Sequence, residues 1–194
     1  MESKISIVII EGPSAVGKDT IINELIRRYP EKFGKPINAT TRPMRENESQ
    51  NNPYLFLSDE EFIAMRKNGE IFEHTKRHGT YRGMRKSSFN EIIDSGRIAV
   101  RDCDILGLHA IKQEYPNKVL SIFLTAPKEE IIKRMMSRNE PKESMELRLR
   151  DYDIYVENAK YFDYVINNIT IDETINQILD IIKNYTDIMK KNQN

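Results

Sequence analysis

One stretch near the start of the chain restricts the possible folds more than any other. Residues 5–10 are mostly β-branched and apolar, and Glu11 ends the run. The letters GPSAVGKDT follow at 12–20, and an amphipathic run begins directly after them. This order predicts a strand, a loop bounded by two glycines and a helix. In such an arrangement the backbone N–H groups and the positive end of the helix dipole face one anion. We therefore predict a phosphate-binding loop over Gly12–Thr20.

Each part of this loop has an expected role in holding the phosphates of a nucleotide. Lys18 is expected to reach the β- and γ-phosphates as a point charge, while the backbone around it forms the cradle. The cradle comprises Gly12, Pro13, Ser14, Ala15, Val16, Gly17, Lys18, Asp19 and Thr20. The usual motif has serine or threonine after the lysine, whereas this chain has Asp19. Because carboxylate and hydroxyl oxygens both bind Mg²⁺, Asp19 and Thr20 are candidate metal ligands. ATP and Mg²⁺ are the expected cofactors.

The composition limits the remaining classes of function. The 194 residues contain 30 Lys and Arg against 30 Asp and Glu, so the formal net charge is zero. A neutral chain is not typical of proteins that act on nucleic acid or at a membrane surface. The single cysteine, Cys103, excludes an internal disulfide and a cysteine-based metal cluster. No apolar stretch approaches the ~20 residues of a membrane span. We expect a cytoplasmic monomer or homodimer that binds small-molecule nucleotides, with no nucleic-acid or membrane partner.

The pattern along the rest of the chain alternates between two kinds of secondary structure. Short apolar runs predict strands, and stretches with helical periodicity separate them. The strands are expected at Ile5–Ile10, Arg97–Val100, Val119–Leu124 and Tyr164–Ile166, and the helices at Lys18–Tyr29, Ser87–Ser95, Ile105–Glu114, Pro127–Arg138, Met145–Tyr161 and about Asp172–Lys190. This alternation is typical of an α/β fold with a parallel central sheet between two layers of helices, the three-layer fold of P-loop NTPases. Ligands should bind at the carboxyl ends of the strands, where Gly12 and Asp102 fall.

Two segments interrupt the alternation within what we expect to be a single domain over 1–194. Residues 36–86 hold short strand-like pieces, turns and one helix near Asp59–Lys67, and we interpret them as an inserted lobe over the sheet. Residues 137–144 are polar and place Pro141 between two helices, which predicts a short, mobile lid at about 137–145. The core then comprises 1–35, 87–136 and 146–194.

Seven stretches, taken in order, resemble the guanylate kinase family. They are EGPSAVGKDT, YPEKFGKPINATTRPMRENE, NPYLFLSDEEF, NGEIFEHTKRHGTYRG, RIAVRDCDILG, SIFLTAPKEEIIKRMMSR and YFDYVINN, and they extend from about Ile5 to Asn168. The Thr-Thr-Arg-x-x-Arg segment at 40–45 is much more specific than the phosphate-binding loop. The resemblance implies a nucleoside monophosphate kinase that uses ATP and Mg²⁺ and favours GMP or dGMP as the acceptor. Residues 36–86 would be its acceptor-binding lobe.

The resemblance also implies roles for individual side chains. Two guanidinium groups three residues apart, Arg42 and Arg45, suit a phosphate clamp with a nearby phenol. The implied acceptor-binding set is Asn38, Arg42, Arg45, Tyr54, Glu73, Tyr81, Asp102 and Asp104. Within it, the arginines and tyrosines would hold the acceptor phosphate, while Glu73, Asp102 and Asn38 would read the acceptor. The implied catalytic set is Lys18, Arg134, Arg138 and Arg148, which would neutralise the transferring phosphoryl group.

Four residues depart from the family pattern and leave two alternatives open. Asn38 replaces a serine, Arg82 replaces the second tyrosine of a Tyr-Tyr-Gly turn, and Met84 replaces a serine or threonine near the base. Asp19 and the cations around Arg82 also suit a phosphonate-pathway ribose 1,5-bisphosphate phosphokinase, a relative of guanylate kinases whose acceptor has no base. The other alternative is a guanylate kinase-like binding module without catalysis. Such modules usually lose the loop glycines and lysine, which this chain keeps.

Overall fold

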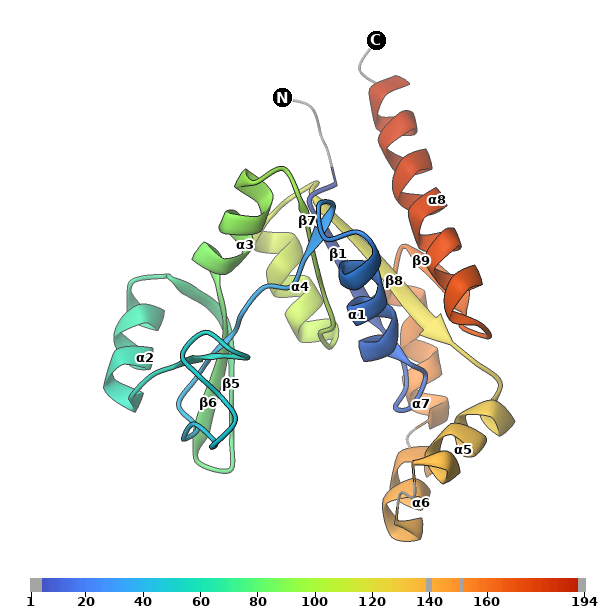
Figure 1. The fold of residues 1–194 in the computed structure, drawn as a ribbon, viewed down its shortest axis with the longest axis horizontal. Helices are drawn as coiled ribbons and strands as arrows, with labels where there is room; N and C mark the ends of the chain where they lie inside the picture. Colours follow the sequence, from blue (N-terminus) through green and yellow to red (C-terminus); the bar gives the residue numbers. More distant parts are fainter. Residues whose placement is uncertain (1–4, 139–140, 151, 192–194) are drawn as a thin grey trace.

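The computed structural model describes residues 5–138, 141–150 and 152–191. A five-stranded sheet with helices on both faces forms the centre of the molecule, and a four-stranded sheet lies beside it (Figure 1). In the larger sheet the strand order is β2-β7-β1-β8-β9, and every pairing is parallel. Its strands are β1 (Ile7–Glu11), β2 (Phe33–Gly34), β7 (Ile98–Arg101), β8 (Val119–Thr125) and β9 (Tyr164–Asn167). The predicted parallel sheet is therefore confirmed.

Both faces of this sheet are buried, which explains why its strands are apolar without alternation. Successive side chains of a strand point to opposite faces. Val8 and Ile10 face the apolar cluster that includes side chains of α1 (Lys18–Arg28), α5 (Lys128–Ser137) and α8 (Ile171–Lys191). Ile7 and Ile9 face the cluster that includes side chains of α3 (Lys86–Asp94) and α4 (Ile105–Glu114). The sheet is thus the middle of three layers, as the sequence predicts.

The ends of the two central strands define where a ligand can approach. Ile9 of β1 pairs with Arg101 of β7, so Glu11 and Arg101 end their strands close together. The loop at 12–17 leaves β1 and leads into α1, and the segment after β7 leads into α4. Polar side chains that follow these strands therefore gather at one edge of the sheet.

The smaller sheet belongs to the lobe that the sequence places between the first helix and α3. Its strand order is β4-β3-β6-β5, with β3 (Ala39–Thr40), β4 (Leu55–Phe56), β5 (Ile71–Arg77) and β6 (Thr80–Arg85). Helix α2 (Asp59–Lys67) has the bounds predicted for it and begins with a capping box, in which Ser58 and Glu61 bond to each other's backbone N–H groups. Phe62, Ala39 and Ile71 form a separate small core between this helix and the sheet.

The structure differs from the sequence prediction in two elements. Strand β2 is a two-residue strand that was not predicted. The helix predicted over Met145–Tyr161 is helical on both sides of residue 151, which lies outside the described residues, as α6 (Lys142–Arg150) and α7 (Tyr152–Glu157). Its predicted end is wrong, because Asn158–Tyr161 form a 3₁₀ turn. Pro141 lies between α5 and α6, as predicted: its carbonyl accepts a bond from the Met145 N–H at the start of α6, and proline fits the first turn. Residues 139–140 of the predicted lid at 137–145 lie outside the described residues.

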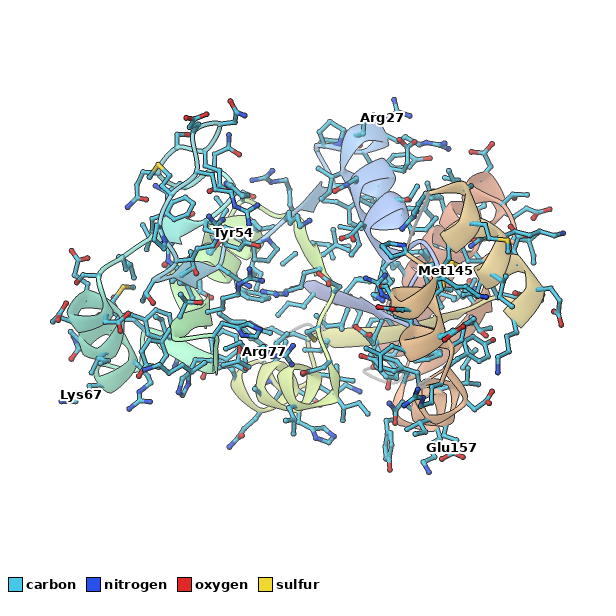
Figure 2. All side chains as sticks on the ribbon, turned by 90° about the horizontal axis from the view of Figure 1, so that it is seen from below. Arg27, Tyr54, Lys67, Arg77, Met145 and Glu157 are labelled. Atoms are coloured by element: carbon cyan, nitrogen blue, oxygen red, sulfur yellow. The ribbon has the colours of Figure 1, made fainter. Side chains whose placement is uncertain are left out.

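The lobe and the α5–α7 region lie on opposite sides of β1 and α1. Figure 2 shows Tyr54 of the lobe and Met145 of α6 on either side of these central elements. Across the described part of the chain, no helix combines the length and the apolar character needed to cross a membrane.

Candidate functional site

The loop after β1 requires glycine at both of its ends. Gly12 passes so close to β8 that a Cβ atom there would lie 2.2 Å from the Leu124 carbonyl oxygen. Gly17 has a φ of 104°, in the left-handed region, and a Cβ there would lie 2.8 Å from the Asn168 Nδ2 atom. These contacts explain the Gly-x₄-Gly spacing physically: a side chain at Gly12 would collide with the β8 backbone, and one at Gly17 would be strained by the positive φ and would displace the Asn168 side chain.

Lys18 turns back over this loop. Its Nζ atom donates to the carbonyl oxygens of Gly12 and Pro13 and lies 3.8 Å from the Glu11 carboxylate. Glu11 is buried, and this burial raises its pKa to about 7, although Lys18 lowers it in part. Sequence reasoning treated Glu11 only as the end of a strand. Its signal was an acidic residue that directly follows an apolar run.

The back of the loop is held by groups from two other elements. Arg134 of α5 donates from Nη1 to the Val16 carbonyl and from Nη2 to the Asn168 carbonyl, each at 2.9 Å. Asn168, just after β9, donates from Nδ2 to the same Val16 oxygen, and Thr174 donates to the Asn168 Oδ1 atom. Arg134 was predicted to contact the transferring phosphoryl group, but the structure places its guanidinium against backbone carbonyls instead. Its predicted contact with the phosphoryl group stays a prediction, and Asn168 and Thr174 are supporting residues that the sequence analysis missed.

The other two predicted catalytic arginines lie near different sides of the loop. Arg148 of α6 donates from Nη1 to the Ser14 hydroxyl at 2.8 Å. It helps to line a hollow of about 250 Å³ with Lys18 and Tyr152. Arg138 follows α5 and lines a second hollow, of about 240 Å³, with Gly17 and Asn168 among its neighbours. The structure thus brings both arginines to the loop.

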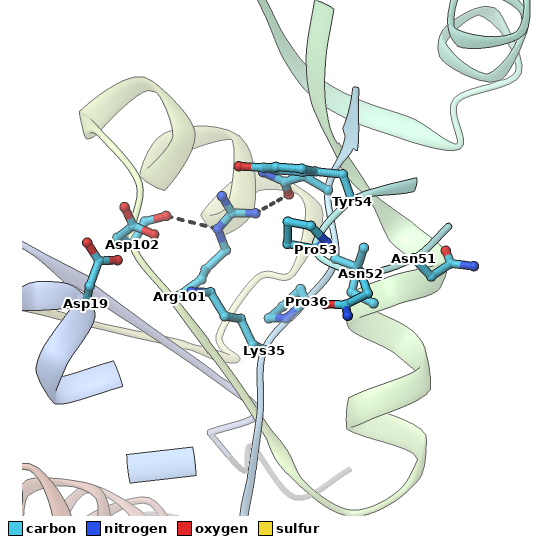
Figure 3. Close-up of a pocket in the computed structure, with 11 residues that line it drawn as sticks. Asp19, Lys35, Pro36, Asn51, Asn52, Pro53, Tyr54, Arg101 and Asp102 are labelled. Atoms are coloured by element: carbon cyan, nitrogen blue, oxygen red, sulfur yellow. Dashed lines mark hydrogen bonds between the residues drawn. The ribbon is translucent and has the colours of Figure 1, made fainter. Parts of the chain in front are cut away.

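A larger pocket of about 420 Å³ lies between the loop and the lobe (Figure 3). Five of the residues that line this pocket are Asp19, Asn38, Tyr54, Arg101 and Asp102. Arg101 donates from Nε to the Asp102 carbonyl and from Nη1 to the Asn38 side-chain oxygen. Asn38, Tyr54 and Asp102 were all predicted, and the structure brings them to one pocket. Arg101 was not predicted.

The predicted phosphate clamp forms only in part in this structure. Both terminal nitrogens of Arg42 donate to Glu48, at 2.8 Å each, and its guanidinium lies 5.5 Å from the centre of the Tyr54 ring. The hydrogen bonds from Arg42 hold the pKa of Glu48 down, at about 2. Arg45 contributes its backbone N–H to Glu48, and its side chain is exposed. Arg42 is therefore next to the predicted tyrosine but is neutralised by a carboxylate.

The predicted role of Tyr81 does not agree with its position. Tyr81 stacks on Phe62 at 5.1 Å between ring centres, on the face of the small sheet that α2 covers. Its neighbour Arg82 points to the other face, as strand alternation requires, and lies 5.5 Å from the Tyr54 ring. Arg82 helps to line a further hollow with Arg42 and Arg77. The side chain that faces the Arg42 and Tyr54 region is thus Arg82 and not Tyr81.

Glu73 and Asp104 lie close enough to influence each other. Glu73 is in β5 at a register irregularity and is half-buried. Burial raises its pKa first, the Asp104 charge raises it further, and Arg101 lowers it. Asp104 caps α4 by accepting a bond from the Gly107 N–H at 2.8 Å, so one of its oxygens already has a structural task. Glu73 is therefore a carboxylate at the lobe side of the site. Hydrogen-bond donors of a ligand would stabilise its charged form.

The two predicted metal ligands face different hollows. Asp19 lines the large pocket with Asp102, and the two carboxylates lie beside each other in Figure 3. Thr20 instead lines the hollow with Arg138. Carboxylate oxygens suit Mg²⁺, which usually keeps several waters and takes one or two carboxylates. Among the described residues, no group of three or more His, Cys, Asp or Glu side chains could hold a metal ion by itself. The carboxylates of Asp19 and Asp102 fit Mg²⁺ that is shared with phosphates, and metal binding by Thr20 stays a prediction.

Known proteins share this sequence and arrangement. A sequence profile described as Guanylate kinase matches residues 4–185. The curated guanylate kinase of Prochlorococcus marinus subsp. pastoris is 37% identical over 185 residues, which cover 94% of this chain and 100% of that protein. The guanylate kinase of Chlorobium luteolum is 34% identical and covers 92% and 91%. The crystal structure of guanylate kinase from Anaplasma phagocytophilum matches with a TM-score of 0.67 and 26% identity, over 96% of this chain and 88% of that one. A gluconokinase structure from Sinorhizobium meliloti, at 12% identity and a TM-score of 0.53, shares the fold alone.

Proposed function

The chain belongs to the guanylate kinase family, and on that premise we propose that it transfers the γ-phosphoryl group of ATP to GMP or dGMP. The products are ADP and GDP or dGDP. One observation carries the proposal for this molecule. A complete phosphate-binding loop with Lys18 opens beside a separate pocket that Asn38, Tyr54 and Asp102 line. An enzyme that aligns two phosphorylated substrates needs two such adjacent compartments.

The donor half of the site consists of the loop and the arginines around it. Gly12–Thr20 hold the phosphates of ATP, and Lys18 exchanges its carbonyl partners for phosphate oxygens. Arg148 bonds to Ser14 of the loop, close enough to neutralise charge on the transferring group. The base of ATP lies in the hollow of Arg138, where planar guanidinium groups offer stacking surfaces.

The acceptor half lies toward the lobe. Arg42, Arg45 and Tyr54 hold the acceptor phosphate, and Arg42 leaves Glu48 to do so. Asn38 reads the acceptor with Glu73 and Asp102. Glu73 accepts hydrogen bonds from the guanine edge, which relieves the desolvation that raises its pKa. Asp102 and Asp104 also contact the acceptor on this side of the site.

Asp19 and Asp102 would hold Mg²⁺, which would supply neutralisation of phosphate charge and alignment of the two substrates. The protein's own contribution is to hold donor and acceptor in line, offset their repulsion and exclude water. We propose that residues 36–86 and 137–145 close over the core at 1–35, 87–136 and 146–194, which would suppress ATP hydrolysis. No covalent intermediate on the protein is required.

Two features support this function over the alternatives. A sugar bisphosphate has no base, so it would leave Glu73 without a hydrogen-bonding partner from the acceptor. A guanine ring instead supplies N–H donors to this half-buried carboxylate. Gly12, Gly17 and Lys18 are arranged to hold phosphates, which a binding module without catalysis does not require. The monomer-or-homodimer expectation stays a prediction.

The test is the production of ADP that depends on both ATP and GMP. Lys18→Met keeps the length of the side chain and removes the charge, and we expect kcat to fall by at least ~100-fold. Lys67→Met, at the exposed end of α2, is the matched control and should leave kcat unchanged. Full turnover in the Lys18 variant, with an unchanged melting temperature, would contradict the proposed donor site.

A further inference from the structure

Arg101 is a buried cation that forms no ion pair with any described residue. It ends β7, and its residue is only 9% exposed. Its guanidinium makes two hydrogen bonds, to the Asp102 carbonyl and to the Asn38 side-chain oxygen, and both acceptors are uncharged. Within the described ranges, no carboxylate lies within ion-pair distance of it. Buried charges are normally paired, because removal from water costs more than neutral hydrogen bonds return. Such a group is suited to an anion that arrives with a ligand.

The free edge of this guanidinium faces the large pocket. Nε and Nη1 are occupied, which leaves Nη2 to donate to a ligand. Figure 3 shows the guanidinium between Asp102 and the Tyr54 ring, on the path from Asp19 to the lobe. Arg101 therefore lies between the side chains assigned to the acceptor phosphate and the end of the donor loop.

The other charged side chains near the pocket explain why a cation is needed at this position. Asp19 and Asp102 line the same pocket and would repel a phosphate group that enters it. Arg42, the expected clamp residue, is bonded to Glu48 through both terminal nitrogens. Arg101 is thus a cation inside the pocket that forms no ion pair within the described part of the chain, although Glu73 is near enough to interact with its charge, and its position is fixed by two hydrogen bonds.

We infer that Arg101 binds the acceptor phosphate directly and is a further specificity-determining residue for phosphorylated acceptors. The inference rests on the proposed function and deepens it. The Nη2 group donates to a phosphate oxygen on the side of the acceptor that faces the donor, while Nη1 keeps its bond to the Asn38 side chain. Arginine suits this task because its planar fork can hold Asn38 and a phosphate oxygen at the same time.

The experiment compares Arg101→Met with Arg101→Lys and measures the KM for GMP, the KM for ATP and the inhibition constant of guanosine. Guanosine has the same base and ribose but no phosphate. We expect Arg101→Met to raise the KM for GMP at least tenfold and to change the ATP and guanosine constants by less than twofold. Arg101→Lys should recover part of the loss. Arg97→Met, just before the opposite end of the same strand, is the matched control and should leave all three constants unchanged.

A double-mutant cycle with Asn38→Ala separates direct binding from positioning. If Arg101 binds phosphate itself, Arg101→Met raises the KM for GMP further in the Asn38→Ala background. No further rise would mean that Arg101 acts only through Asn38, and this result would overturn the inference. Equal losses for GMP and guanosine would overturn it as well. Should Arg101→Met not fold, the lysine variant carries the same comparison. GMP turnover by the unchanged protein, together with normal constants in the Arg101 variants, would leave the proposed function intact and refute only this inference.

Discussion

Replacing Glu11 by glutamine should make the protein more stable at neutral and alkaline pH. Glu11 is 6% exposed at the end of β1, and its pKa is raised from 4.5 to about 7, first by burial and then by Asp102 and Asp104. Lys18 opposes this effect from 3.8 Å. A carboxyl whose pKa is raised by folding contributes most stability when it is protonated, below pH 4.5. That contribution is lost as the pH rises to about 7.

The size of the effect follows from the two pKa values. Each pH unit between them corresponds to ~1.4 kcal/mol, so the ionised form of Glu11 costs the folded state ~3 kcal/mol above pH 7. Glutamine has nearly the same shape as the protonated acid and never ionises. The unfolding free energy of Glu11→Gln, relative to the original protein, should therefore rise by ~3 kcal/mol between pH 4.5 and pH 8.

Urea unfolding without nucleotide, at several pH values between 4.5 and 8, measures this difference. Glu24→Gln is the control, because hydrogen bonds from Arg27 and Arg28 lower the pKa of Glu24 to about 2. Its stability relative to the original protein should be constant above pH 4.5. If the Glu11→Gln difference were also constant, Glu11 would titrate at its ordinary pKa. A difference that fell with rising pH would mean that the ion pair with Lys18 outweighs burial, and the reasoning would be refuted.

Two further substitutions test the metal ligand and the lobe. Asp19→Ser should change the ratio of kcat/KM measured with Mg²⁺ to that measured with Mn²⁺, because Asp19 lies beside Asp102 in the pocket; an unchanged ratio would show that Asp19 does not bind the metal. Phe62→Ala should lower the free energy of unfolding by ~3–5 kcal/mol, because Phe62 is fully buried and stacks on Tyr81 in the small core of the lobe. Urea unfolding measures this loss, and a change below ~1 kcal/mol would contradict the importance of that core.

Local patterns explain which parts of the fold the sequence predicts well. The strand, loop and helix around Lys18 are specified by residues that are adjacent in the chain, and helix α4 has the predicted bounds. Strand β2 could not be predicted in this way, since its two residues become a strand only by pairing with β7. The 3₁₀ turn at Asn158–Tyr161 likewise depends on how the chain packs, not on its hydrophobic period.

The site residues that sequence reasoning misplaced or missed depend on contacts between distant segments. Which of Tyr81 and Arg82 faces the pocket is decided by strand register, and a shift of one residue exchanges the faces. The charge of Arg134 suits a phosphate group. In the folded chain, however, its guanidinium donates to the carbonyl oxygens of Val16 and Asn168, which are distant in sequence. Arg101 has no local signal in the sequence, because an arginine at the end of a strand is unremarkable until its lack of an ion pair in the described part of the chain is seen.

The central claim is that the acceptor is a guanine nucleotide, and a comparison of acceptors tests it most directly. ADP release with ATP and Mg²⁺ is measured for GMP, dGMP, AMP, CMP, UMP, dTMP and ribose 1,5-bisphosphate. We predict that kcat/KM for GMP or dGMP exceeds that for every other acceptor by at least ~100-fold, because Glu73 rejects bases without matching donors. A higher kcat/KM for ribose 1,5-bisphosphate or another nucleotide, or no turnover with any acceptor while ATP still binds, would contradict the account.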